Sequence, residues 1–219
     1  MAQAPSTFLT KDSKLLELQS PADAEILVRD GLTVAGKDIS EFDVNDLIWD
    51  RYEDLRAPAT AINPPGAASD PNRDTGDGTL LFDAGGTELV FVLMQLPHSY
   101  KEGTDVSPHI HWCKTTSAGG NVIWQMRYRV YRIGEVAEAW STLTTASVLT
   151  ADADTAELHA MAEWEDVSGT LLGISDTIIF QVQRTGGAGA DTYGADARLL
   201  EFDIHYQADS SGSAAEFTK

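Results

Sequence analysis

Residues 121–133, "NVIWQMRYRVYRI", constrain the fold more than any other stretch of the chain. Apolar side chains occupy every second position from Val122 to Val130, and the positions between them include Gln125 and Arg127. Successive side chains of a β-strand point to opposite faces, so a period of two predicts a strand with one buried and one solvated face. The fold must therefore contain a sheet that covers a core on one side.

Similar apolar or aromatic runs recur from residue 79 onward, separated by connectors rich in Gly, Asp, Ser and Thr. Residues 155–169 have the Ala and Glu content of a helix, but their position between two strands favours another strand. We expect about eight strands in total and an all-β fold, an antiparallel jelly-roll β-sandwich with an extended N-terminal arm or small module.

Composition divides the chain into three parts. The segment that begins at residue 57, "APATAINPPGAASDPNRDTGDG", is rich in Pro, Gly and Asp and predicts a loop that opens the β-rich part. We assign residues 57–208 to the jelly-roll domain and residues 209–219, which are small and polar, to a flexible C-terminal tail. Residues 1–56 form the N-terminal arm or module.

The N-terminal part has its own local signals. A β-hairpin is predicted around the turn pair Asp30-Gly31, and a helix could begin after Ser40. So few residues can hardly bury a sizeable core alone, so we expect this part to anchor the protein by packing against a partner. Aromatic and large aliphatic side chains dominate interface energies, and the candidate anchors are Leu47, Ile48, Trp49 and Tyr52.

Charge and composition exclude several classes of function. The formal net charge is −19 and would repel nucleic-acid phosphates, so we predict no nucleic-acid partner. No stretch approaches the ~20 apolar residues of a membrane span, and the first residues do not resemble a signal peptide. We therefore expect no membrane insertion and assembly in a cytoplasm. The single cysteine, Cys113, allows no intrachain disulfide.

Two histidines, His109 and His111, lie two residues apart in "SPHIHWCKT". On a strand both imidazoles would point to one face, while Ile110 and Trp112 would point to the other. Pairs with this spacing hold metals in barrels, because both rings can converge on one ion. With Gly103 before them, they also resemble the opening of the first metal motif of cupin jelly rolls.

The rest of the cupin pattern is missing. No acidic residue occurs three or four positions after His111, and neither His159 nor His205 has the Pro and Gly context of the second motif. We therefore predict ordinary strand histidines, with no catalytic residue, no cofactor and no metal. If a metal were bound, His109 and His111 would be its ligands; the candidates for a third are His98 and His205, then Glu201 and Asp203.

Two further features have alternative interpretations. The segment "DPNRDTGDG" brings acidic side chains together as calcium loops do, but it lacks their spacing and closing glutamate, so an acidic turn is favoured. Four tryptophans lie in separate predicted strands, and most should belong to the core. One that is exposed in a groove would suit stacking on a sugar ring. These residues are Trp112, Trp124, Trp140 and Trp164.

One longer pattern resembles a known family. The phrases "YEDLRAPATAINPPGAASDP", "LLFDAGGTELVFVLMQLPHSYKEGTDVSPHIHW" and "GADTYGADARLLEFDIHYQ" are similar to virion structural proteins of tailed bacteriophages and prophages. The resemblance covers about residues 52–207. It implies a jelly-roll domain displayed on a virus particle, as a trimeric head decoration, fibre or tail-associated protein. It implies no active-site residue.

We therefore expect a non-enzymatic virion protein, a homotrimer attached to capsid, neck or tail proteins through its N-terminal segment. The first alternative is a carbohydrate-binding module of the virion that recognises a host-surface glycan. The second is a cupin-like metal-dependent enzyme that uses His109 and His111.

Overall fold

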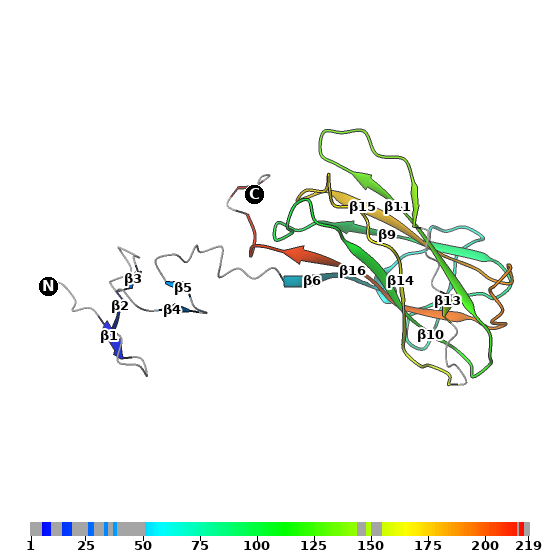
Figure 1. The fold of residues 1–219 in the computed structure, drawn as a ribbon. Helices are drawn as coiled ribbons and strands as arrows, with labels where there is room; N and C mark the ends of the chain where they lie inside the picture. Colours follow the sequence, from blue (N-terminus) through cyan, green and yellow to red (C-terminus); the bar gives the residue numbers. More distant parts are fainter. Residues whose placement is uncertain are drawn as a thin grey trace. The chain divides into compact units, whose positions relative to one another are not determined.

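The computed structural model describes residues 51–143, 155–213, 215 and 216 in full, and elsewhere only the backbone of short strands. The chain divides into two compact units, Met1–Trp49 and Asp50–Lys219 (Figure 1). Among the described residues, no helix is long and apolar enough to cross a bilayer.

The first unit contains short antiparallel strands. One sheet has the order β1-β2-β3, and β4 pairs with β5 in a second sheet. The bounds are β1 (Ser6–Leu9), β2 (Leu15–Leu18), β3 (Ile26–Val28), β4 (Thr33–Val34) and β5 (Lys37–Asp38).

The hairpin predicted around Asp30-Gly31 is wrong. Its two arms correspond to β3 and β4, but β3 pairs with β2 and β4 pairs with β5. The helix expected after Ser40 lies outside the described residues.

The second unit is a sandwich of two antiparallel sheets, visible as two layers in Figure 1. The six-stranded sheet has the order β14-β10-β16-β8-β7, and β6 also pairs with β16. A short 3-10 turn, Ala59–Ala61, follows β6. The strands of this sheet are β6 (Arg51–Pro58), β7 (Asn72–Arg73), β8 (Leu80–Phe82), β10 (Ser107–Lys114), β14 (Ala160–Glu163) and β16 (Ala197–Ala208).

The five-stranded sheet has the order β12-β11-β15-β9, with β13 also paired to β11. Together the two sheets confirm the predicted all-β antiparallel sandwich of jelly-roll type. The strands of this sheet are β9 (Thr87–Gln95), β11 (Val122–Tyr131), β12 (Ser141–Leu143), β13 (Val148–Leu149) and β15 (Thr177–Thr185).

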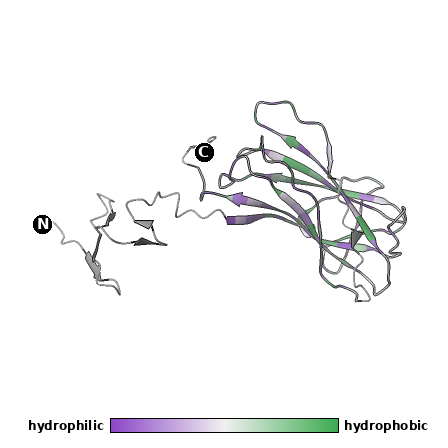
Figure 2. Ribbon diagram, viewed as in Figure 1, coloured by the Kyte–Doolittle hydropathy of each residue, from purple (hydrophilic) through white to green (hydrophobic). Residues whose placement is uncertain are grey.

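Aromatic side chains fill the space between the sheets. Trp124 on β11 is fully buried and meets Phe82 and Trp112 edge-on, with ring centroids 4.9 and 5.8 Å apart. Edge-to-face pairs suit the positive edge and negative face of aromatic rings. Figure 2 shows hydrophobic and hydrophilic residues interspersed along the longer strands of the sandwich, as this arrangement requires. Trp112, Trp124 and Trp164 are core residues, as most of the tryptophans were expected to be.

A charged pair also lies inside the sandwich. Arg184 at the end of β15 is fully buried and its Nη2 is 3.0 Å from Asp191 Oδ1. The same guanidinium donates to the backbone carbonyls of Phe82, Tyr193 and Ala195. A buried charge is tolerated when it is paired and fully hydrogen-bonded, and here it fastens the 186–196 loop to both sheets.

One boundary and one strand register differ from what the sequence pattern predicts. The expected domain start at residue 57 falls inside β6, which pairs with β16 from Arg51↔Ala208 to Pro58↔Glu201. In β16 the register shifts opposite His111/Trp112, so Leu199 is fully buried, whereas a strict alternation continued from Phe202 and Ile204 would place Leu200 on the core face. A β-bulge adds one residue to one strand and reverses the alternation beyond it.

Candidate functional site

The histidine pair lies on the outer face of the six-stranded sheet. In β10, Ile110 and Trp112 are fully buried in the core, so His109 and His111 point away from it, as the alternation predicts. The neighbouring strand β16 places Asp203 directly opposite His109. Residues directly opposite or diagonal on one face of an antiparallel pair are within side-chain reach.

Asp203 joins the two imidazoles. His109 Nε2 is in close contact with Asp203 Oδ1, and His111 Nε2 lies 3.3 Å from Oδ2. The candidate ligand atoms of the three residues lie within 4.8 Å of one another. The side chains of His109 and Asp203 are each only 5% exposed, whereas that of His111 is 25% exposed. Asp203 was the last of the four candidate third ligands named from the sequence, and it is the one that joins His109 and His111.

Two more histidines border this group. His159 Nε2 is 2.7 Å from His111 Nδ1, and the ring of His205 packs 4.4 Å from that of His109. His205 Nε2 also contacts Asp54 Oδ1 on β6 at 3.0 Å. We call His109, His111, His159, His205 and Asp203 the histidine cluster.

The remaining histidine, His98, is engaged elsewhere. Its Nδ1 is 2.5 Å from Ser213 Oγ and its Nε2 is 3.3 Å from Ser175 Oγ. Sequence analysis named His98 as a candidate third ligand and set His159 aside because it lacks the context of the second cupin motif. His159 lies just before β14, and β14 pairs with β10 through His111↔Met161 and His109↔Glu163. This pairing brings His159 next to His111.

Opposing effects act on the pKa of His109. Burial disfavours the imidazolium, but hydrogen bonding and charge attraction from Asp203, with a smaller effect of the Ser107 carbonyl, outweigh it and raise the pKa of His109 above its ordinary value. Apart from its close contact with His109 Nε2, which departs from the usual hydrogen-bond angle, Asp203 Oδ1 has no hydrogen-bond partner among the described residues. A buried carboxylate oxygen in that state favours a cation beside it.

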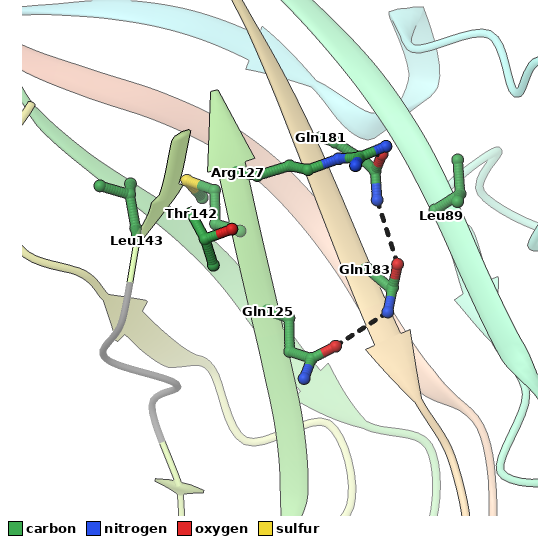
Figure 3. Close-up of a pocket in the computed structure, with 8 residues that line it drawn as sticks. Leu89, Gln125, Arg127, Thr142, Leu143, Gln181 and Gln183 are labelled. Atoms are coloured by element: carbon green, nitrogen blue, oxygen red, sulfur yellow. Dashed lines mark hydrogen bonds between the residues drawn. The ribbon is translucent and has the colours of Figure 1, made fainter. Parts of the chain in front are cut away.

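A second candidate site is a groove on the outer face of the five-stranded sheet (Figure 3). It has a volume of about 510 Å³ and its lining is rich in side-chain amides. The lining residues are Leu89, Gln125, Met126, Arg127, Thr142, Leu143, Gln181 and Gln183.

Hydrogen bonds hold these amides in line across β11 and β15. Arg127 Nε donates to Gln181 Oε1 at 2.7 Å, and Gln181 Nε2 donates to Gln183 Oε1 at 3.0 Å. Gln183 Nε2 in turn donates to Gln125 Oε1 at 2.8 Å. Figure 3 shows the amides as a chain along the groove. Each such amide can both donate and accept, which suits a neutral polar ligand.

Aromatic rings flank this groove. The guanidinium of Arg127 lies 4.6 Å above the ring of Trp140, and Phe91 lies 6.0 Å from the same ring. Trp140 is half-buried and Phe91 is 38% exposed. Of the tryptophans that the structure describes, Trp140 is therefore the one outside the core, beside the groove.

The predicted anchors are placed only in part. Leu47, Ile48 and Trp49 lie outside the described residues. Tyr52 lies on β6, is 66% exposed, and its hydroxyl accepts a hydrogen bond from Gln207 Nε2 at 3.0 Å. It therefore belongs to the sandwich unit and leaves its ring at the surface.

The acidic segment after residue 70 forms a turn, and an arginine side chain of the same chain pairs with its carboxylates. Arg198 Nη1 contacts Asp74 Oδ2 at 2.9 Å and Asp77 Oδ2 at 2.7 Å. Asp74 and Asp77 also accept bonds from the backbone N–H groups of Gly76 and Thr79. These contacts agree with the acidic-turn interpretation.

No protein-family model matches the chain. No curated protein matches it either. Among solved structures, CBM35 from Cellvibrio japonicus Abf62 matches 76% of this chain and 99% of its own, at 9% identity and a TM-score of 0.39. Infectious bursal disease virus, Gx strain, matches 96% of this chain at 12% identity and a TM-score of 0.38.

A cycloisomaltooligosaccharide glucanotransferase from Paenibacillus sp. matches 68% of this chain, at 13% identity and a TM-score of 0.37. This chain spans 18% of that enzyme and 43% of the viral protein. The domain is a jelly-roll-like β-sandwich by its own topology, and its likeness to the CBM35 and viral structures is distant. TM-scores below 0.5 carry no inference about what this chain binds.

Proposed function

We propose that this chain is a structural protein of a tailed-bacteriophage virion. Its sandwich is displayed on the particle, and its N-terminal segment attaches it to a capsid, neck or tail protein. The observation that carries the proposal is the division of the chain: Asp50–Lys219 is a compact unit with its own core, and Met1–Trp49 is a separate unit. The phrases similar to virion proteins lie wholly within the sandwich unit.

A particle-binding assay tests this role. Tagged full-length chain and tagged residues 50–219 are each supplied during growth of the encoding phage, whose own copy of the gene is disrupted. We expect the full-length chain to co-purify with particles and the truncated chain to stay folded but unbound. Absence of the full-length chain from particles, or equal incorporation of both, would refute the proposal.

We further propose that the sandwich forms a trimer through one end. Exposed apolar side chains gather there: Ile133 is 71% exposed and Leu171 is 69% exposed, and both line one shallow hollow. Arg132 Nε donates to the Leu171 carbonyl at 2.8 Å and holds the two loops together. Burial of such side chains favours association.

Light scattering on the eluting full-length protein tests the trimer. Ile133→Glu and Leu171→Glu should convert the trimer to monomers, because each buries a charge at the contact. Met161→Glu, on the other sheet where Met161 is 40% exposed, is the matched control and should leave the trimer intact. A monomeric wild type, or a trimer in all three variants, would contradict this assembly.

A second candidate function is carbohydrate binding, and the groove on the five-stranded sheet favours it. Its amide chain, the Arg127 guanidinium and the adjacent Trp140 ring are the group types that hold a sugar by hydrogen bonds and stacking. We propose that this groove binds a neutral host-surface glycan.

A glycan array probed with the full-length protein tests this function. Binding should be lost in Trp140→Ala and Gln183→Ala and kept in Arg56→Ala, which changes the outer face of the other sheet. An array without hits for the wild type would refute the function. So would hits that persist in both groove variants.

We propose that the chain is not an enzyme. Both oxygens of Asp203 face an imidazole, and its residue is 3% exposed, so the histidine cluster has no free carboxylate to act as a base. This favours a structural role for His109 and His111, with or without a bound metal, over catalysis by the cupin-like metalloenzyme alternative.

A further inference from the structure

We infer that the outer face of the six-stranded sheet holds one divalent transition-metal ion, Zn²⁺, bound by His109, His111 and Asp203. The three candidate ligand atoms lie within 4.8 Å of one another. Zinc takes histidine nitrogens at about 2.0–2.1 Å and carboxylate oxygens at about 2.0–2.2 Å, so its ligand atoms lie at most about 4.2 Å apart. A small rotation of His111, whose side chain is 25% exposed, would bring the three groups onto one ion. This site does not depend on the proposed virion role.

The arrangement favours a metal over a plain ion pair. One carboxylate receives the Nε2 atoms of two imidazoles, one at each oxygen. One imidazolium is enough to balance the negative charge of the Asp203 carboxylate. A second imidazole that is neutral contributes nothing to that balance. Apart from its close contact with His109 Nε2, the buried Oδ1 atom also has no hydrogen-bond partner among the described residues. A cation between the three groups would satisfy that oxygen and both rings together.

Neighbouring residues hold the ligands in place. His109 Nδ1 lies 3.4 Å from the Ser107 carbonyl, a contact that directs Nε2 toward Asp203. The ring of His205 packs against His109 and is itself paired with Asp54. Outer partners of this kind fix the tautomer and the orientation of metal-binding imidazoles. His159, 2.7 Å from His111 Nδ1, is placed to orient His111 in the same way.

The donor set selects the ion. Ca²⁺ and Mg²⁺ prefer oxygen ligands, whereas two imidazoles and one carboxylate suit Zn²⁺ and its late first-row neighbours. The ion would join β10 to β16, whose Cα partners include His109↔Asp203, and would stabilise the sheet at its centre. Binding to the folded state alone raises stability by mass action.

The test uses the full-length chain, stripped with EDTA and titrated with Zn²⁺ by calorimetry, with bound metal measured by mass spectrometry after desalting. We expect one Zn²⁺ per chain. Saturating Zn²⁺, about a hundred times Kd, should raise Tm by about 5–10 °C. His111→Gln and Asp203→Asn should each weaken binding by at least about tenfold.

His98→Gln is the matched control, because His98 lies outside the histidine cluster and contacts Ser213 and Ser175. Its affinity for Zn²⁺ should equal that of the wild type. Circular dichroism reports whether each variant folds. Because His111 is partly exposed, His111→Gln should fold and still tests the site if Asp203→Asn does not fold. Absence of stoichiometric Zn²⁺ in the wild type, or equal binding in wild type and His111→Gln, would overturn the inference.

Discussion

The two outer faces of the sandwich carry different chemistry on the same scaffold. The six-stranded sheet presents ionisable groups in contact with one another: imidazoles around Asp203, and Arg56 bonded to both oxygens of Glu201 at 2.7 and 2.6 Å. The five-stranded sheet presents amides and aromatic rings, with Gln183 and Trp140 among them. Both sheets bury aliphatic and aromatic side chains inside. The inner faces therefore determine the fold, and each outer face is free to specialise.

The buried Arg184–Asp191 pair is the reference against which both outer faces can be compared. Arg184→Leu leaves Asp191 buried without its partner and should destabilise the protein by about 3–5 kcal/mol. Urea denaturation followed by tryptophan fluorescence measures the loss. Arg129→Leu, on the outer face of the same sheet, is the control and should cost at most about 1 kcal/mol, mainly one bond to the Glu138 carbonyl. Equal losses of stability in the two variants would mean that the buried Arg184 contributes no more than an arginine on the outer face of the sheet.

The next comparison is between the two outer faces in metal-free protein. His109→Ala removes the closest partner of a carboxylate that is 5% exposed, and should cost about 1–3 kcal/mol. Gln183→Ala removes a partly buried amide from its chain and should cost about 0.5–1 kcal/mol, because its partners can turn to water. The same denaturation assay in EDTA measures both. A larger loss for Gln183→Ala would show that the groove, not the histidine cluster, is the more constrained face.

Sequence analysis correctly predicted the features that depend on a single strand, namely which of its side chains face the core. The alternation in β11 predicted its buried face, and the spacing of His109 and His111 predicted that both leave the core. Asp203 and His159 could not be ranked, because their proximity depends on which strands pair and in which register. The groove was missed for the same reason.

Strand β6 was missed for a different reason. Its eight residues have no fully buried side chain, since it is an edge partner of β16 with charges on it. Charged edge strands protect a sheet from unwanted pairing, but they lack the apolar alternation by which strands are recognised. The bulge in β16 likewise leaves no signal in composition: Leu199 and Leu200 are adjacent and identical, and only the pairing decides which one is buried.

Within the groove, the stacked pair should show a small but measurable coupling. Arg127 lies 4.6 Å above the Trp140 ring, and a cation–π pair at a partly exposed site is worth about 0.5–1 kcal/mol. A double-mutant cycle of Arg127→Ala and Trp140→Ala, read by urea denaturation, isolates this energy from other losses. A coupling indistinguishable from zero would mean that the two groups are placed independently, and would weaken the case for a preformed sugar platform.

The smallest expected effect concerns Cys113, which lies two residues beyond His111 but faces Glu157 instead of Asp203. Burial, aided by the hydrogen bond from Sγ to Glu157 at 3.2 Å, raises the pKa of this thiol to about 12. At pH 8 only about one molecule in ten thousand would carry a thiolate, the reactive form. A thiol reagent such as DTNB should therefore leave the native protein unlabelled while it labels the urea-unfolded chain fully. Rapid labelling of the native protein would show that the β10–β16 surface opens at this end, and that the ionisable face is less rigid than its contacts indicate.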